Sequence, residues 1–106
     1  MDRFLARTLR DMTGEVVDWI DPLLPNRNPF DTAIKMQEEL SELLHALHSG
    51  EGDVGGELAD MFILLLDCAH LNYINLQLAF EKKMEINRRR LWKPSMGTMK
   101  HEKEDK

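Results

Sequence analysis

The sequence predicts an all-α protein: a four-helix subunit whose helical bundle is completed by homodimerisation. Apolar residues recur every three to four positions over most of the chain, which is the period of an α-helix. Proline and glycine residues gather in short stretches that separate these periodic segments. No segment shows the alternation of apolar and polar residues that is typical of a strand. At 106 residues, the chain is expected to form one domain with a modest core.

The first expected helix ends at Ile20, before a proline. Its apolar stripe, at helical spacing, consists of Phe4, Leu5, Leu9, Met12, Val16, Val17 and Ile20. The stretch from Asp21 to Phe30 holds three prolines, so we expect an irregular connection there.

The second expected helix is capped by Asp31 or Thr32. Its apolar face comprises Ala33, Met36, Leu40, Leu43, Leu44 and Leu47. The glycine-rich stretch from Ser49 to Gly56 ends the helix and forms a turn.

The third expected helix, from about Gly56 to Leu71, is apolar nearly all the way round. Such a helix is buried on most sides, and one small subunit can hardly cover it. We therefore expect a second copy to pack against it, and a tetramer built from two dimers is a further option.

The fourth expected helix follows Asn75 as its cap and runs to about Trp92, with Pro94 just beyond. The remaining residues, 93–106, are polar and mixed in charge, which predicts a disordered tail. The expected domain is therefore 1–92.

Two acidic pairs lie at helical spacing on the second and third helices. Glu39 and Glu42 project from the one, and Glu57 and Asp60 from the other. A tight turn would bring all these carboxylates together, where they repel one another unless a cation such as Mg²⁺ lies among them. Either pair alone is more often a solvated helix face, so spacing by itself leaves both interpretations open.

Asp67 lies on the same stripe of the third helix as Glu57 and Asp60. Carboxylates in a buried setting need partners. A metal ion or basic groups from elsewhere would supply them, and Asp67 could instead bond a neighbouring helix or a ligand.

Composition narrows the function classes. The net charge of −5 argues against a general nucleic-acid binder. The lone Cys68 favours a reducing, cytoplasmic location. The apolar run that ends at Asp67 is too short to span a membrane, and no P-loop motif is present.

These residues together resemble the MazG-like family of all-α nucleoside triphosphate pyrophosphohydrolases, in its compact single-domain form. The family pattern Glu-Glu-x-x-Glu, a turn and Glu-x-x-Asp is matched by residues 38–42 and 57–60, and Lys35 precedes it as expected. The later Lys-x-x-x-Asn-x-x-Arg pattern is matched by Lys83, Asn87 and Arg90. The family's Gly-Ile-Asp turn is replaced here by Tyr73-Ile74-Asn75.

The resemblance implies Mg²⁺-dependent cleavage of a nucleoside triphosphate, expected to be a deoxyribonucleotide, to the monophosphate and pyrophosphate. The implied role is house-cleaning of the nucleotide pool. Mn²⁺ is a possible substitute. The implied metal ligands are Glu39, Glu42, Glu57 and Asp60. Glu38 is the candidate for positioning or deprotonating the attacking water.

The implied substrate-binding residues are Lys35, Lys83, Asn87 and Arg90, of which the last three could instead form a solvated basic helix end. Trp19 could stack on a base, although an aromatic residue there is more often core. Two alternatives remain: a non-catalytic helical dimer acting as an adaptor or regulator, and a metal-dependent hydrolase of another phosphate substrate.

Overall fold

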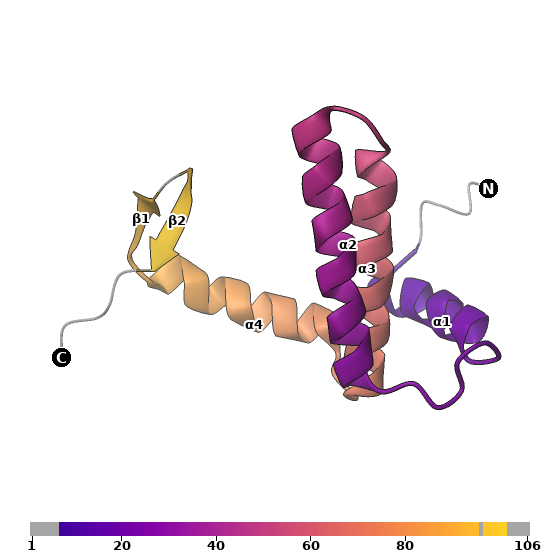
Figure 1. Ribbon diagram of the computed structural model, residues 1–106. Helices are drawn as coiled ribbons and strands as arrows, with labels where there is room; N and C mark the ends of the chain where they lie inside the picture. The colour runs from indigo at the N-terminus through magenta and orange to yellow at the C-terminus, as the bar shows by residue number, and fades with distance from the viewer. Residues whose placement is uncertain (1–6, 96, 102–106) are drawn as a thin grey trace. The chain divides into compact units, whose positions relative to one another are not determined.

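The computed structural model describes residues 7–95 and 97–101 and confirms the predicted all-α class (Figure 1). The described elements are the helices α1 (Leu9–Ile20), α2 (Pro29–Ser49), α3 (Val54–Leu71) and α4 (Leu76–Arg89), followed by the short strands β1 (Trp92–Ser95) and β2 (Thr98–His101). They form two compact units, the first ending at Leu76 and the second beginning at Gln77.

The first unit is built on α2 and α3, which lie side by side and run in opposite directions (Figure 1). The turn between them uses Gly50 at φ 72° and Gly52 at φ 106°, and the left-handed region costs glycine little. Gly50 also donates its N–H to the carbonyl of Ala46 (3.1 Å) and so ends α2.

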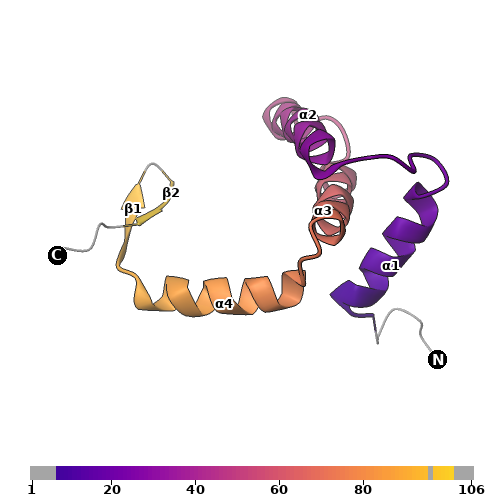
Figure 2. The ribbon, with the colours of Figure 1, turned by 90° about the horizontal axis from the view of Figure 1, so that it is seen from below.

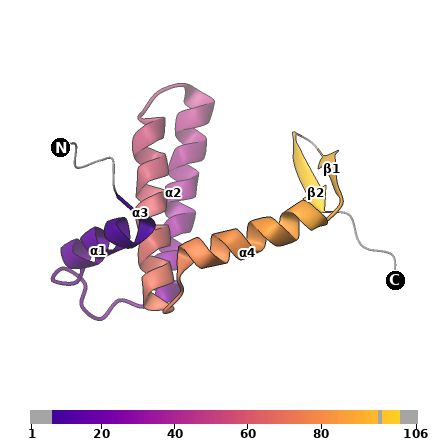
Figure 3. The ribbon, with the colours of Figure 1, turned by 180° about the vertical axis from the view of Figure 1, so that it is seen from behind.

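The α1 helix packs against α3 (Figures 2 and 3). Thr8 and Asp11 form a capping box at its start, since each side chain accepts a hydrogen bond from the other residue's backbone N–H. The predicted helix began earlier, but Phe4 and Leu5 lie outside the described residues.

Our prediction for the cap of α2 was wrong. The cap is Asn28, whose side-chain oxygen accepts from the backbone N–H of Asp31 (2.9 Å), and Pro29 occupies the first helical position. Proline fits there because that position needs no backbone donor. Asp31 and Thr32 therefore lie inside the first turn.

The core of the first unit is small. Among the described residues, the buried apolar side chains are those of Leu43, Ala46 and Leu66, and of these Leu66 is fully buried. Large apolar side chains of α3, such as Leu58 and Leu65, are about half exposed in the single chain. In the described part of the chain, no helix has the combination of length and apolar character that crossing a bilayer requires.

The second unit contains most of α4 and an antiparallel hairpin in which Trp92 pairs with His101 and Ser95 with Thr98. This hairpin lies where we expected a disordered tail from residue 93 onward; residues 102–106 are outside the described part. The Trp92 ring packs against the His101 ring at 5.4 Å, and its indole N–H donates to the carbonyl of Asn87 (2.6 Å). These contacts join the two strands to each other and the hairpin to the end of α4.

Candidate metal centre

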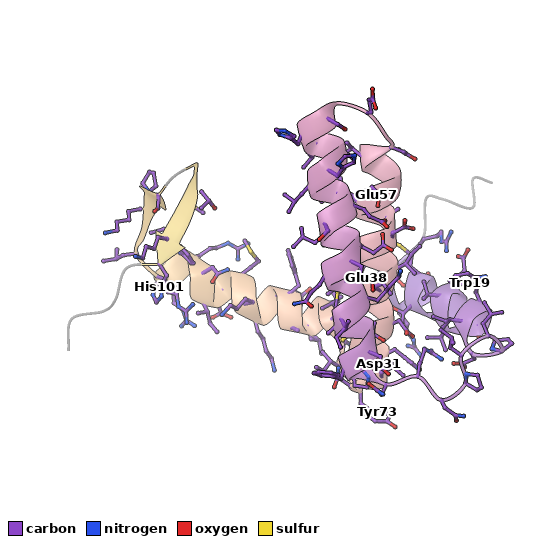
Figure 4. All side chains as sticks on the ribbon, viewed as in Figure 1. Trp19, Asp31, Glu38, Glu57, Tyr73 and His101 are labelled. Atoms are coloured by element: carbon purple, nitrogen blue, oxygen red, sulfur yellow. The ribbon has the colours of Figure 1, made fainter. Side chains whose placement is uncertain are left out.

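The tight turn between α2 and α3 brings carboxylates of both helices to one place. Glu39, Glu42 and Glu57 each offer an oxygen atom, and these three atoms lie within 4.8 Å of one another. Figure 4 shows Glu38 and Glu57 on the two paired helices. The spacing of three residues on α2 and the antiparallel pairing therefore bring together three of the four carboxylates that the sequence predicts to converge.

Burial makes this cluster unfavourable without a cation. Glu39 is only 8% exposed, and one carboxylate oxygen of Glu39 and one of Glu57 are buried with no hydrogen-bond partner in the described part of the protein. Burial raises the pKa of both carboxyl groups, and the neighbouring charge of Glu42 raises it further. These two buried oxygens without a hydrogen-bond partner, here called orphaned, lie beside a third carboxylate. Together they are a suitable ligand set for a hard divalent cation.

Asp60 lies outside this group of three. Its side chain is exposed, one helical turn after Glu57, yet its negative charge contributes to the raised pKa values of Glu39 and Glu57. Asp60 is thus near the cluster, and its role as a fourth ligand stays a prediction.

Lys35 and Glu38 form an ion pair at the edge of the cluster. The Lys35 ammonium lies 2.9 Å from a carboxylate oxygen of Glu38 and 3.7 Å from one of Glu39. The hydrogen bond to Glu38 raises the pKa of Lys35, which therefore stays protonated. Both side chains are more than half exposed and accessible to a ligand.

Trp19 lines a cavity of about 560 Å³ between α1 and α3. The walls are mostly apolar and include Val16, Phe62, Ile63 and Leu66, and an ion pair between Arg7 and Glu15 adds charge. Trp19 remains 61% exposed, so it is not a core residue (Figure 4). A cavity of this size is in the range of small-molecule sites, which span about 300–1,000 Å³.

The cavity begins close to the acidic cluster. Ile63 follows Asp60 by three residues on α3, a rise of about 4.5 Å along the helix axis. A ligand that fills the cavity could therefore extend toward the carboxylates.

Sequence reasoning missed the partner of Asp67. The Arg27 guanidinium donates two hydrogen bonds of 2.7 Å to this buried carboxylate. A signal was present, since a carboxylate in an apolar helix demands a cation and Arg27 is the basic residue of the proline-rich connection. The two residues are 40 positions apart in the sequence, so spacing along the chain did not predict their pairing.

The predicted phosphate-binding residues belong to the second unit. Lys83 is exposed, and Asn87 and Arg90 are half-buried. Their spacing of four and three residues places them on one face at the end of α4. The side-chain oxygen of Asn87 is buried without a hydrogen-bond partner among the described residues.

No family model matches the chain. A dATP/dGTP diphosphohydrolase of Cyanophage S-2L is 37% identical over 98 residues, which cover 92% of this chain and 90% of that protein. A dATP/dGTP diphosphohydrolase of Salmonella phage PMBT28 is also 37% identical, over 89% of this chain but 31% of its own length.

A solved structure is similar over nearly its whole length. The Cyanophage S-2L MazG-like pyrophosphohydrolase, bound to dGDP and three catalytic Mn²⁺ ions per active site, matches with a TM-score of 0.81 and 35% identity. The match covers 92% of this chain and 99% of that one.

Proposed function

The chain belongs to the MazG-like pyrophosphohydrolase family and is a hydrolase of nucleotide phosphoric anhydrides, and we propose that its substrates are purine deoxyribonucleoside triphosphates. Water would cleave these to the monophosphate and pyrophosphate, which clears unwanted or excess nucleotides from the pool. The observation that carries the proposal is the pair of orphaned carboxylate oxygens on Glu39 and Glu57, beside Glu42.

The carboxylates of Glu39, Glu42 and Glu57, with Asp60 beside them, are the proposed ligands of Mg²⁺, with Mn²⁺ as a substitute. A divalent ion bound there would neutralise phosphate charge and lower the pKa of a bound water. The chain contributes the fixed spacing of the oxygens and a partly desolvated setting, in which their charge acts more strongly.

Glu38 is the proposed base. Its carboxylate is more than half exposed and lies next to the cluster in sequence, so it can accept the proton of an attacking water. Lys35 holds that carboxylate by an ion pair and keeps donors for a substrate phosphate.

The cavity beside Trp19 is the proposed base-binding site. An exposed indole offers a stacking surface, and the apolar walls exclude water from a flat ring. The names of the relatives, which are dATP/dGTP diphosphohydrolases, favour a purine deoxyribonucleotide. Lys83, Asn87 and Arg90 are proposed to bind phosphate oxygens of the substrate.

We further propose that the active form is a homodimer in the cytoplasm, with a dimer of dimers as the larger assembly. Exposed leucines form a stripe on α2 at positions 40, 44 and 47, and Leu58 and Leu65 are exposed on one face of α3. Exposed leucines on two helices of a subunit with so small a core favour burial against another copy.

A panel of ribo- and deoxyribonucleoside triphosphates, with separate detection of pyrophosphate and orthophosphate, tests the proposal. We expect turnover of dGTP and dATP with pyrophosphate as product, dependent on Mg²⁺ or Mn²⁺. Release of orthophosphate alone would indicate cleavage at another phosphorus. Turnover confined to other phosphate esters would contradict the proposed substrate class.

A further inference from the structure

The ion pair of Arg27 and Asp67 is the most buried charged contact of the described chain. The Arg27 side chain is 7% exposed and that of Asp67 is 1% exposed. Nε and Nη2 of the guanidinium each lie 2.7 Å from a different carboxylate oxygen, so the pair is bidentate. Such a fork fixes the orientation of both groups as well as their distance.

The same guanidinium also binds the end of α1. Its Nη1 lies 2.7 Å from a carboxylate oxygen of Asp21, the residue that caps the C-terminus of α1, and 3.1 Å from the carbonyl of Leu24. Arg27 therefore links α1, the proline-rich connection and α3 through one planar group.

The α1 helix has few other anchors. None of its residues, 9–20, is fully buried, so packing alone holds it weakly against α3. The connection of residues 21–28 to α2 has no regular secondary structure. The position of Trp19, two residues before Asp21, therefore depends on the link through Arg27.

The acidic residues, the cavity wall and Asp67 follow one another along α3. The acidic Glu57 and Asp60 come first, and the wall of the cavity follows at Ile63 and Leu66. Asp67 comes directly after this wall. Along α3, the ion pair thus lies beyond the cavity wall, on the side away from the acidic residues.

We propose that Arg27, through Asp67 and Asp21, is a positioning residue that sets the width of the base-binding cavity by fixing the end of α1 that carries Trp19. This inference rests on the proposed function for its effect on catalysis. The ion pair of Arg27 and Asp67 does not include any residue of the acidic cluster. We therefore expect its loss to change substrate binding with little change in the rate of the chemical step.

The test compares two variants with the wild type. Replacing Arg27 with Met and Asp67 with Leu together removes the pair without leaving a buried charge unpaired. Arg27→Lys keeps a cation beside Asp67 but lacks the planar fork that contacts Asp67 and Asp21 at once. Arg89→Met is the matched control, because its ion pair with Glu85 is exposed and lies on α4.

Two readouts are needed. Steady-state kinetics with dGTP and Mn²⁺ give kcat and KM in the otherwise native sequence. Fluorescence anisotropy is measured in a Trp92→Phe background, where Trp19 is the remaining indole of the two, with and without dGDP.

We expect the double variant to raise KM by about tenfold or more, to change kcat by less than about threefold, and to lower the anisotropy of Trp19. Arg27→Lys should shift KM and the anisotropy of Trp19 in the same directions by a smaller amount. If the double variant does not unfold cooperatively, Arg27→Lys alone decides whether Arg27 positions α1. The proposal would be overturned if Arg27→Lys and the folded double variant both kept the wild-type KM and anisotropy. A fall in kcat with no change in KM would overturn it as well.

The control should match the wild type in both readouts. If the wild type hydrolyses no nucleotide, the proposed function fails, whereas the anisotropy of Trp19 still decides whether Arg27 positions α1. The two failures are therefore distinguishable.

Discussion

The buried carboxylate of Glu39 opposes folding in the absence of metal, and this gives a prediction at the scale of one residue. Glu39→Gln keeps the side-chain shape but removes a charge from beside Glu42 and Glu57. We expect the metal-free variant to melt at a higher temperature than the wild type at neutral pH, and its turnover to fall by roughly a hundredfold or more.

Thermal unfolding in EDTA and turnover in Mn²⁺ measure these two effects. Glu51→Gln, in the exposed α2–α3 turn, is the control and should change neither. A Glu39→Gln variant with full activity would remove this carboxylate from the proposed ligand set.

The raised pKa values of Glu39 and Glu57 predict how stability depends on pH. In the window between the ordinary pKa of a glutamate and these raised values, the folded metal-free protein holds more protons than the unfolded chain. Its free energy of unfolding therefore falls as the pH rises through that window, and the loss persists at higher pH.

Melting temperatures of the wild type and Glu39→Gln in EDTA, from about pH 4 to about pH 8, test this, since titratable groups remote from the cluster cancel in the difference. The stability of the wild type relative to the variant should fall as the pH rises. Saturating Mn²⁺ should remove this disadvantage in the wild type. A difference that grows in favour of the wild type in EDTA would contradict the expected sign.

A separate prediction concerns Glu38, because it is exposed, paired with Lys35 and outside the group of three carboxylates. Glu38→Gln should lower kcat by about a hundredfold or more, as expected for loss of a general base. The midpoint of a Mn²⁺ titration should stay close to the wild-type value. A weakened Mn²⁺ midpoint with normal kcat at saturating metal would instead make Glu38 a ligand.

How far the site could be predicted depended on sequence distance. Glu39 and Glu42 share a helix, and Glu57 follows a short turn, so local geometry sufficed to bring them together. The contact of Arg27 with Asp67 joins an irregular connection to a helix 40 residues away. The connection that carries Arg27 has no periodic sequence pattern, so the contact between Arg27 and Asp67 is visible only in the folded chain.

At the scale of elements, the end of α2 depends on a glycine. Gly50 lies at φ 72°, a region that costs a residue with a Cβ about 1–2 kcal/mol, although the space around it is open. Gly50→Ala should therefore destabilise the protein by about this amount. Gly14→Ala, in the body of α1 and also in open space, should instead stabilise it by up to about 1 kcal/mol.

Urea or thermal unfolding of the two variants measures the effect, with a shift of several degrees expected per kcal/mol for a domain of this size. The same substitution should thus have opposite signs at two open sites. A stabilising Gly50→Ala would show that the turn does not require the left-handed conformation.

The helices were predictable and their ends less so. The apolar period located α1 to α4 in order, because it reports which faces are buried. The cap of α2 was misplaced because Asn28 and Pro29 lie in a stretch that prolines make irregular. The hairpin of β1 and β2 was missed because its strands have four residues each and depend on the contact of Trp92 with His101.

At the scale of the whole molecule, exposed apolar surface is the dominant feature of the single chain. Leu44 and Leu47 of α2 are each 58% exposed, and Leu58 of α3 is 53% exposed. Water contact with so many large apolar side chains is unfavourable, and a second copy offers the same apolar surface in return.

The proposed homodimer should therefore have twice the 12.4 kDa mass of the chain, or four times in a dimer of dimers, when measured by light scattering. Replacing both Leu44 and Leu47 with Glu should shift the mass toward the monomer, because two charges would have to be buried in the contact. Leu91→Glu makes the same change at an exposed leucine outside these stripes and should leave the mass unaltered. A wild type that is monomeric across the concentration range, with full turnover, would contradict an active dimer and would leave the leucine stripes of α2 open to solvent in the working enzyme.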